Sequence, residues 1–101
     1  MGKIQINVPG DKISEFCKRY RINKLSLFGS VLRSDFSDSS DIDVLIEFEP
    51  GHGTGYFGLA RMERELTAII GRKVDLRTPQ ELSRYFREEV LSKAEIQYAE
   101  R

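Results

Sequence analysis

The feature that most constrains this chain is a run of eight residues, 41–48 (DIDVLIEF), in which apolar side chains alternate with others. Alternation with a period of two is typical of a β-strand with one buried face. The pattern places Ile42, Val44, Ile46 and Phe48 on one face and Asp41, Asp43, Leu45 and Glu47 on the other. Asp is disfavoured inside strands, so two aspartates on one face indicate that this face carries polar chemistry.

Apolar spacing elsewhere predicts two further strands, over residues 24–29 and 73–77, and three helices. The helices are expected over residues 11–20, from about residue 56 to Gly71, and from Thr78-Pro79 onward. Their buried stripes would be Ile13, Phe16, Cys17 and Tyr20; Leu59, Met62, Leu66, Ile69 and Ile70; and Leu82, Phe86 and Val90. The tail after Ala94 is expected to fray or to dock elsewhere. We predict an α/β (α+β) fold with a small mixed three-stranded sheet and helices mainly on one face.

Length and charge narrow the class of protein further. A chain of 101 residues has room for one small domain, which we assign to residues 1–101. Sixteen basic and sixteen acidic side chains leave a net charge of zero, which disfavours stable nucleic-acid binding. The single cysteine, Cys17, cannot form an internal disulfide, and no apolar run approaches the roughly 20 residues of a membrane span. We expect a cytoplasmic protein with no membrane association. The sequence leaves open whether the chain forms a homo-oligomer.

The two aspartates of the central strand suggest a magnesium site. Residues two apart on a strand point to the same side, with Cβ atoms about 6 to 7 Å apart, so the carboxylates of Asp41 and Asp43 converge. Two ionised carboxylates held this close need a proton or a cation. Mg²⁺ prefers carboxylate oxygens together with substrate phosphates, and two such ions can clamp a phosphoryl-type transfer. Asp75, on the outward face of another strand between Lys73 and Arg77, would add a third carboxylate.

A candidate phosphate cradle follows the first strand. Gly29 would let backbone N–H groups approach a phosphate, and Ser30 would add a hydroxyl. Arg33 could reach the same anion. Together with the aspartates, these residues provide what a nucleoside triphosphate needs.

Gly29-Ser30, ten intervening residues and Asp41-Ile42-Asp43 resemble the GS-x10-DxD signature of the nucleotidyltransferase superfamily. The segment GSVLRSDFSDSSDIDVLIEF and the later VDL are most similar to the minimal nucleotidyltransferases of the MNT class. The resemblance covers roughly residues 25–90. Members of that class are often the antitoxins of HEPN/MNT toxin–antitoxin pairs, which implies transfer of AMP from ATP to a tyrosine of the HEPN partner.

The resemblance also implies roles for individual residues. Gly29 and Ser30 would hold the triphosphate, Asp41 and Asp43 would bind two magnesium ions, and Asp75 would be a third acid that ligates metal or activates the acceptor. The VDL motif matches the third-acid position by context alone, so the register of Asp75 on its short strand is the point to check.

Three alternatives stay open on the sequence. The chain could neutralise its partner by contact alone, or it could transfer a nucleotidyl group to a small molecule or an RNA. Residues 53–58 also satisfy GxGxxG, but the preceding strand ends too early and the chain is too short for a doubly wound dinucleotide-binding sheet.

The remaining charged side chains, Glu63 and Glu65 among them, are expected to form solvated pairs on helix surfaces.

Overall fold

The computed structural model describes residues 8–29, 41–53, 56–82 and 84–99, without the side chains of residues 56, 57 and 86. Along the chain the elements are α1 (Gly10–Arg19), β1 (Ile22–Phe28), β2 (Ile42–Phe48), α2 (Tyr56–Ile70), β3 (Val74–Arg77), a 3₁₀ helix (Pro79–Glu81), α3 (Arg84–Lys93) and β4 (Glu95–Ala99). The helix and strand types expected up to residue 77 are confirmed, with bounds shifted by one or two residues.

The described strands form one mixed sheet in the order β3-β2-β1-β4. Strand β2 runs parallel to β3 and antiparallel to β1, which in turn pairs antiparallel with β4. The expectation of three strands was therefore wrong by one, because the tail after Ala94 forms β4. Opposite Leu25 of β1, Tyr98 packs against the core, so the tail is held by the sheet rather than left to fray.

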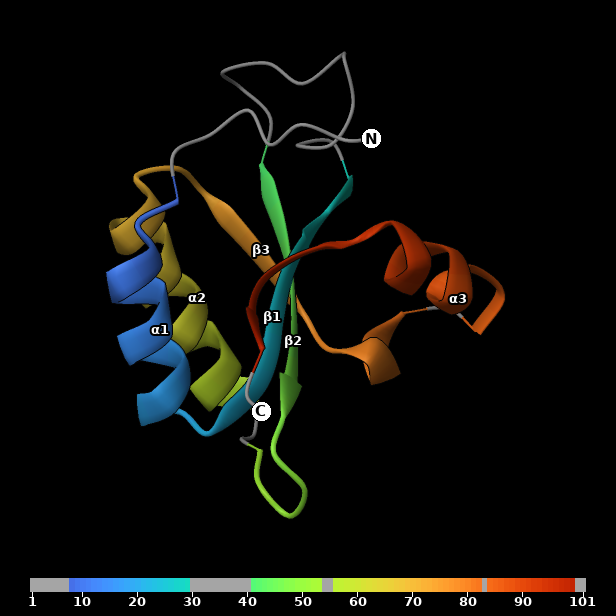
Figure 1. Cartoon of the computed structure of the whole chain (residues 1–101), viewed down its shortest axis with the longest axis horizontal. Helices are drawn as coiled ribbons and strands as arrows, with labels where there is room; N and C mark the ends of the chain where they lie inside the picture. The colour runs from blue at the N-terminus through green and yellow to red at the C-terminus, as the bar shows by residue number, and fades with distance from the viewer. Residues whose placement is uncertain (1–7, 30–40, 54–55, 83, 100–101) are drawn as a thin grey trace.

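One face of the sheet is covered by α1 and α2, which lie side by side in Figure 1. The predicted stripes of both helices face this core: Ile13, Phe16 and Cys17 are buried in α1, and Met62 and Leu66 in α2. From the sheet they meet Ile42, Val44 and Ile46, the apolar set that alternation predicted. None of the described helices, of which α2 is the longest at 15 residues, has the length and apolarity that a membrane crossing requires.

The last predicted helix is broken in the structure. A short 3₁₀ helix, Pro79–Glu81, ends at Leu82, whose backbone is extended, and α3 begins afresh at Arg84. The Glu81 carboxylate accepts a hydrogen bond from the Thr78 backbone N–H at 3.0 Å, which closes the first turn.

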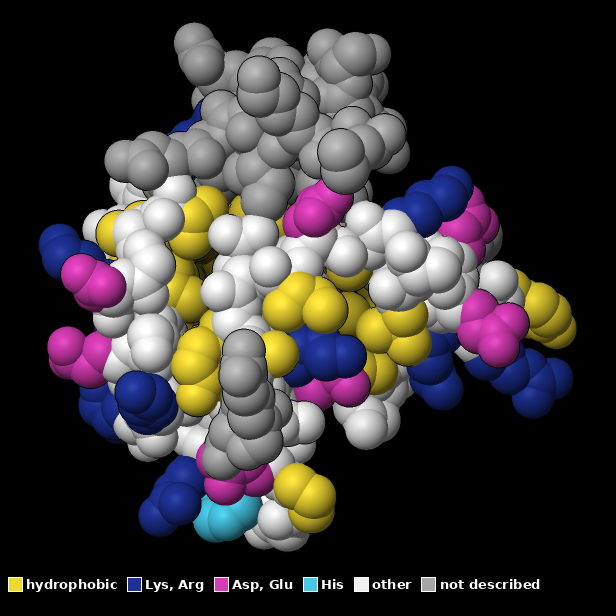
Figure 2. All heavy atoms as spheres, viewed as in Figure 1, with side chains coloured by type: hydrophobic (Ala, Val, Ile, Leu, Met, Phe, Trp, Pro, Cys, Tyr) yellow, Lys and Arg dark blue, Asp and Glu magenta, His cyan; other side chains and the backbone are white. Residues whose placement is uncertain are grey.

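Figure 1 shows α3 on the side of the sheet away from α1 and α2. Charged side chains line the outer surfaces of α1 and α3, and apolar ones gather between them (Figure 2).

The buried thiol of Cys17 makes folding sensitive to alkaline pH. Burial raises the pKa of the Cys17 thiol from 9.0 to about 12. Well below pH 9 the thiol is protonated in both states and does not affect stability. Above pH 9 the unfolded chain loses this proton and the native protein keeps it, so the free energy of unfolding falls as pH rises, by at most about 1.4 kcal/mol per pH unit.

We therefore expect the urea midpoint to fall between pH 8.5 and 10.5, and to fall less steeply in Cys17→Ala. Tyr20, whose pKa is also raised by burial and by its hydrogen bond to Glu65, acts in the same direction at higher pH and leaves some slope in the variant. Equal slopes in the two proteins would contradict the assignment to Cys17.

Candidate functional site

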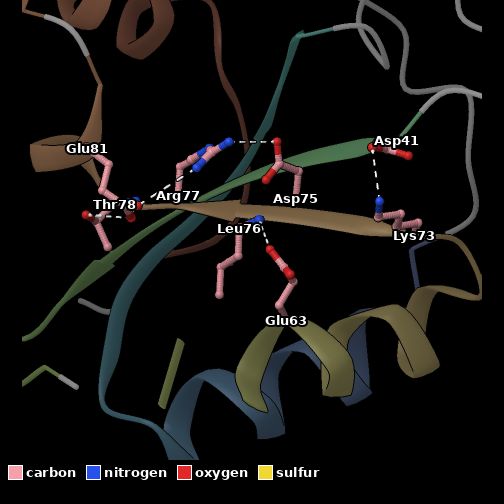
Figure 3. Close-up of polar contacts among 8 residues, drawn as sticks. All are labelled: Asp41, Glu63, Lys73, Asp75, Leu76, Arg77, Thr78 and Glu81. Carbon is pink, nitrogen blue, oxygen red and sulfur yellow. Dashed lines mark hydrogen bonds and ion pairs between the residues drawn. The ribbon is translucent and has the colours of Figure 1, made fainter. Parts of the chain in front are cut away.

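Strand pairing brings two of the predicted acids together. In the parallel register of β2 and β3, Asp43 is the partner of Asp75. Neighbouring strands lie about 4.8 Å apart, and paired residues point to the same face, so the two carboxylates are neighbours on one surface. That surface is the one away from α2: in Figure 3 the Asp75 side chain extends to one side of β3, and Leu76 extends to the other, toward the helix.

The backbone at the end of β1 lies against the Asp43 side chain. Gly29 has a φ of +73°. It follows Phe28, the residue of β1 that pairs with Asp43 of β2. A Cβ added to Gly29 would overlap the Asp43 carboxylate oxygen Oδ2 and come within 3.0 Å of Cγ. Only glycine fits this position without a shift, because the Asp43 carboxylate occupies the space that a Cβ at position 29 would need. The predicted phosphate cradle therefore begins directly beside a predicted metal ligand.

Asp41 lies one residue before β2 and opposite Lys73 when the β2–β3 register is extended. Its carboxylate is 4.0 Å from the Lys73 ammonium, as drawn in Figure 3. Two places beyond Asp75 along β3, the Arg77 guanidinium donates a hydrogen bond of 3.2 Å to the Asp75 carboxylate. Lys73, just before β3, and Arg77, at its end, thus balance the charge of Asp41 and Asp75.

The residues present fit a magnesium–nucleotide site better than a closed protein cage. Among the residues that the structure describes, no three Asp, Glu, His or Cys side chains are grouped so as to hold a metal ion by themselves. Adjacent carboxylates such as Asp43 and Asp75 repel one another and favour a cation between them. Mg²⁺ usually takes one or two carboxylates and completes its shell with water and substrate phosphates. Gly29, the first residue of the predicted phosphate cradle, lies beside Asp43.

Two predicted residues, Ser30 and Arg33, lie outside the described residues, as do residues 54–55 of the GxGxxG segment. His52, the single histidine of the chain, is exposed in a loop, and Cys17, expected in the buried stripe of the first helix, is buried in the core. The core assignment of Cys17 is confirmed.

A cavity of about 580 Å³ lies at the other end of β2, between residues 46–53 and 78–81. Its acidic side chains already have partners: Glu47 lies 3.8 Å from Lys24, Glu49 lies 4.0 Å from Arg21, and Glu81 accepts a hydrogen bond from the Thr78 N–H. The cavity includes neither Asp43 nor Asp75. We therefore place the candidate site at the paired aspartates.

Sequence reasoning missed two side chains that hold the strand of Asp75. Glu63 and Thr67 of α2 accept hydrogen bonds from the backbone N–H groups of Leu76 and Val74. The expectation that Glu63 belongs to a solvated helix surface was therefore wrong. Glu65 does form a solvent-exposed pair, but its partner is Arg19 of α1 at 2.7 Å rather than a neighbour on its own helix, and it also accepts a hydrogen bond from Tyr20 at 3.1 Å. The only sequence signal for the contact with β3 was the spacing of Glu63 and Thr67, which lie four apart beside the apolar stripe of α2.

Residues 11–97 match the protein family described as a nucleotidyltransferase domain. A Methanocaldococcus jannaschii protein, provisionally named a protein adenylyltransferase, is 31% identical over 91 residues, which are 90% of this chain and 96% of the relative. A solved structure described provisionally as a minimal nucleotidyltransferase superposes with a TM-score of 0.69 at 30% identity, covering 84% of this chain and 85% of the other.

A third comparison is informative about the fold. The structure of the tri-AMPylated HEPN toxin of Shewanella oneidensis in complex with its MNT antitoxin matches with a TM-score of 0.65 and 17% identity. The match covers 90% of this chain and 70% of the other. At this identity the likeness shows a shared fold.

Proposed function

This chain belongs to the nucleotidyltransferase domain family, and on that premise we propose that it transfers AMP from ATP to a tyrosine hydroxyl of a HEPN-type toxin and so acts as an antitoxin. The observation that carries the proposal is the pairing of Asp43 with Asp75 on one face of the sheet, with the Gly29 backbone against Asp43. The names of the relatives support AMP as the transferred group and a HEPN toxin as the acceptor.

In the proposed reaction the acceptor oxygen attacks the α-phosphorus of ATP, the bond to the bridging oxygen breaks, and pyrophosphate leaves. Asp43 and Asp75 would hold Mg²⁺, with Asp41 at the same edge of the sheet. Mg²⁺ held there would neutralise phosphate charge and polarise the P–O bonds. The Gly29 backbone and the Ser30 hydroxyl would orient the triphosphate, and Arg33 would balance its charge.

A tyrosine hydroxyl is a weak nucleophile at neutral pH because its ordinary pKa is near 10. A carboxylate within reach of that hydroxyl can accept its proton as the new bond forms. Asp75 is the acid we propose for this step, because a carboxylate that holds the metal with one oxygen can accept the proton with the other. Arg77, which contacts Asp75 at 3.2 Å, would have to release the carboxylate first.

The test uses the chain with the partner that co-purifies with it, incubated with labelled ATP and Mg²⁺. We expect label on the partner, one mass step per AMP by intact-mass measurement, and none with Asp41→Ala plus Asp43→Ala. Label on RNA or on a small molecule would redirect the acceptor assignment. If the double variant neutralises the partner as well as the parent does, neutralisation works by contact and the catalytic proposal fails.

A further inference from the structure

Strand β3 is an outer strand of the described sheet, so one side of its backbone faces away from β2. An outer strand usually exposes unpaired N–H groups to which other strands can bind. Here two of those groups are bonded by side chains of α2. The Val74 N–H donates to the Thr67 hydroxyl oxygen at 3.1 Å, and the Leu76 N–H donates to the Glu63 carboxylate at 2.9 Å.

The two acceptors on α2 are spaced by nearly the same distance as the two N–H groups on β3. Residues 63 and 67 are four apart on a helix, which is an advance of about 6 Å. Residues 74 and 76 are two apart on a strand, which is an advance of about 6.6 Å. The Thr67 hydroxyl also donates to the Glu63 backbone carbonyl at 2.9 Å, which fixes its orientation. The two side chains therefore bind β3 at a single register.

That register decides where Asp75 lies, because Asp75 is the residue between the two bonded amides. A slip of one residue would turn its carboxylate toward the helices. A slip of two would bring Lys73 or Arg77, both basic, opposite Asp43. Strand β3 has only four residues, so its ladder with β2 offers few bonds to resist such slips.

From this arrangement we infer that Glu63 and Thr67 are positioning residues that hold Asp75 beside Asp43. The inference rests on the proposed function, in which these aspartates bind the metal. Figure 3 shows the geometry: Glu63 reaches the Leu76 amide on one side of β3, and the Asp75 carboxylate lies on the other. Outer-shell groups of this kind typically change metal affinity or activity by about 10- to 100-fold when removed.

The variants are Glu63→Ala, which removes one acceptor, and Thr67→Val, which removes the other and keeps the side-chain shape. Glu63→Gln retains an acceptor oxygen and should restore the behaviour of the parent. Glu65→Ala is the matched control, because Glu65 lies on the same helix and binds Arg19 and Tyr20 instead of β3. A role limited to stability would affect Glu63→Ala and Glu65→Ala alike.

Two measurements separate positioning from stability. Amide hydrogen exchange at Val74 and Leu76 should accelerate at least about tenfold in Glu63→Ala and Thr67→Val, because opening of β3 exposes these groups. Mn²⁺, used as the probe for the metal, should broaden the Asp75 amide resonance in the parent, in Glu63→Gln and in Glu65→Ala. In Glu63→Ala and Thr67→Val the apparent Mn²⁺ affinity and the kcat for AMP transfer should fall about tenfold, with the KM for ATP nearly unchanged.

The inference is overturned if Glu63→Ala and Glu65→Ala show the same Mn²⁺ affinity, or if exchange at the two amides does not change in Thr67→Val. If Glu63→Ala fails to fold, the measurements on Thr67→Val decide whether the inference holds. A parent protein that transfers no AMP would reject the proposed function. In that case the exchange rates and the Mn²⁺ broadening still test whether α2 positions Asp75.

Discussion

Asp43→Asn is expected to abolish AMP transfer and leave the fold intact. The substitution keeps the shape of the side chain and removes the negative charge that would hold Mg²⁺ next to Asp75. Metal Lewis-acid stabilisation is worth several kcal/mol, so we expect the rate to fall by about three orders of magnitude. The measurement is the initial rate of label transfer at saturating ATP, with far-ultraviolet circular dichroism to verify the fold.

The same substitution tests metal binding through stability. Asp43 and Asp75 are neighbouring carboxylates, and a cation bound between them offsets their repulsion. We therefore expect added Mg²⁺ to raise the urea midpoint of the parent and to leave that of Asp43→Asn unchanged.

Glu47→Gln is the matched control for Asp43→Asn, because Glu47 lies on the same face of β2 and contacts Lys24 at 3.8 Å. It should keep both the transfer rate and the Mg²⁺ effect. A rate for Asp43→Asn within tenfold of the parent would contradict the assignment of Asp43 as a metal ligand.

Gly29→Ala is expected to be the second most damaging substitution for activity. The new Cβ would occupy the position of the Asp43 carboxylate, so either that side chain must rotate or the strands must separate. A displacement of about 1 Å at a reacting centre can cost on the order of 100-fold in rate. We expect a loss of that size in the rate of AMP transfer.

Gly71→Ala separates this steric effect from backbone strain. Gly71 has a φ of +83°, close to the +73° of Gly29, but a Cβ there would meet nothing within 4 Å. Both alanines should cost about 1 to 2 kcal/mol of stability through the left-handed backbone. Only Gly29→Ala should lose activity per folded molecule, measured after urea unfolding has established the folded fraction. Equal activity in the two variants would show that Gly29 does not shape the site.

The local elements of this protein could be predicted because their signals are contained in short stretches of chain. The stripe of Ile13, Phe16 and Cys17 has the period of a helix, and the alternation of β2 has the period of a strand. Gly71 follows the last residue of α2, where a positive φ is needed. The GS-x10-DxD resemblance indicated the family from fifteen consecutive positions, 29–43.

Other features depend on residues far apart in sequence. Strand β4 is stabilised by pairing with β1, about 70 residues earlier, and its own five residues carry little strand signal. The extended backbone of Leu82, which separates the 3₁₀ helix from α3, is likewise not signalled by the apolar spacing of Leu82, Phe86 and Val90.

The sequence by itself determined which acids the chain offers and which strands carry them, because residue type and alternation are local properties. Only the tertiary structure decided that Asp75 lies beside Asp43, since this depends on the parallel register of β2 and β3. The same is true of Gly29 against Asp43 and of the bonds from Glu63 and Thr67 to β3. Strand register and helix-to-strand contacts are set by how separate elements pack, and a single stretch of sequence does not encode them.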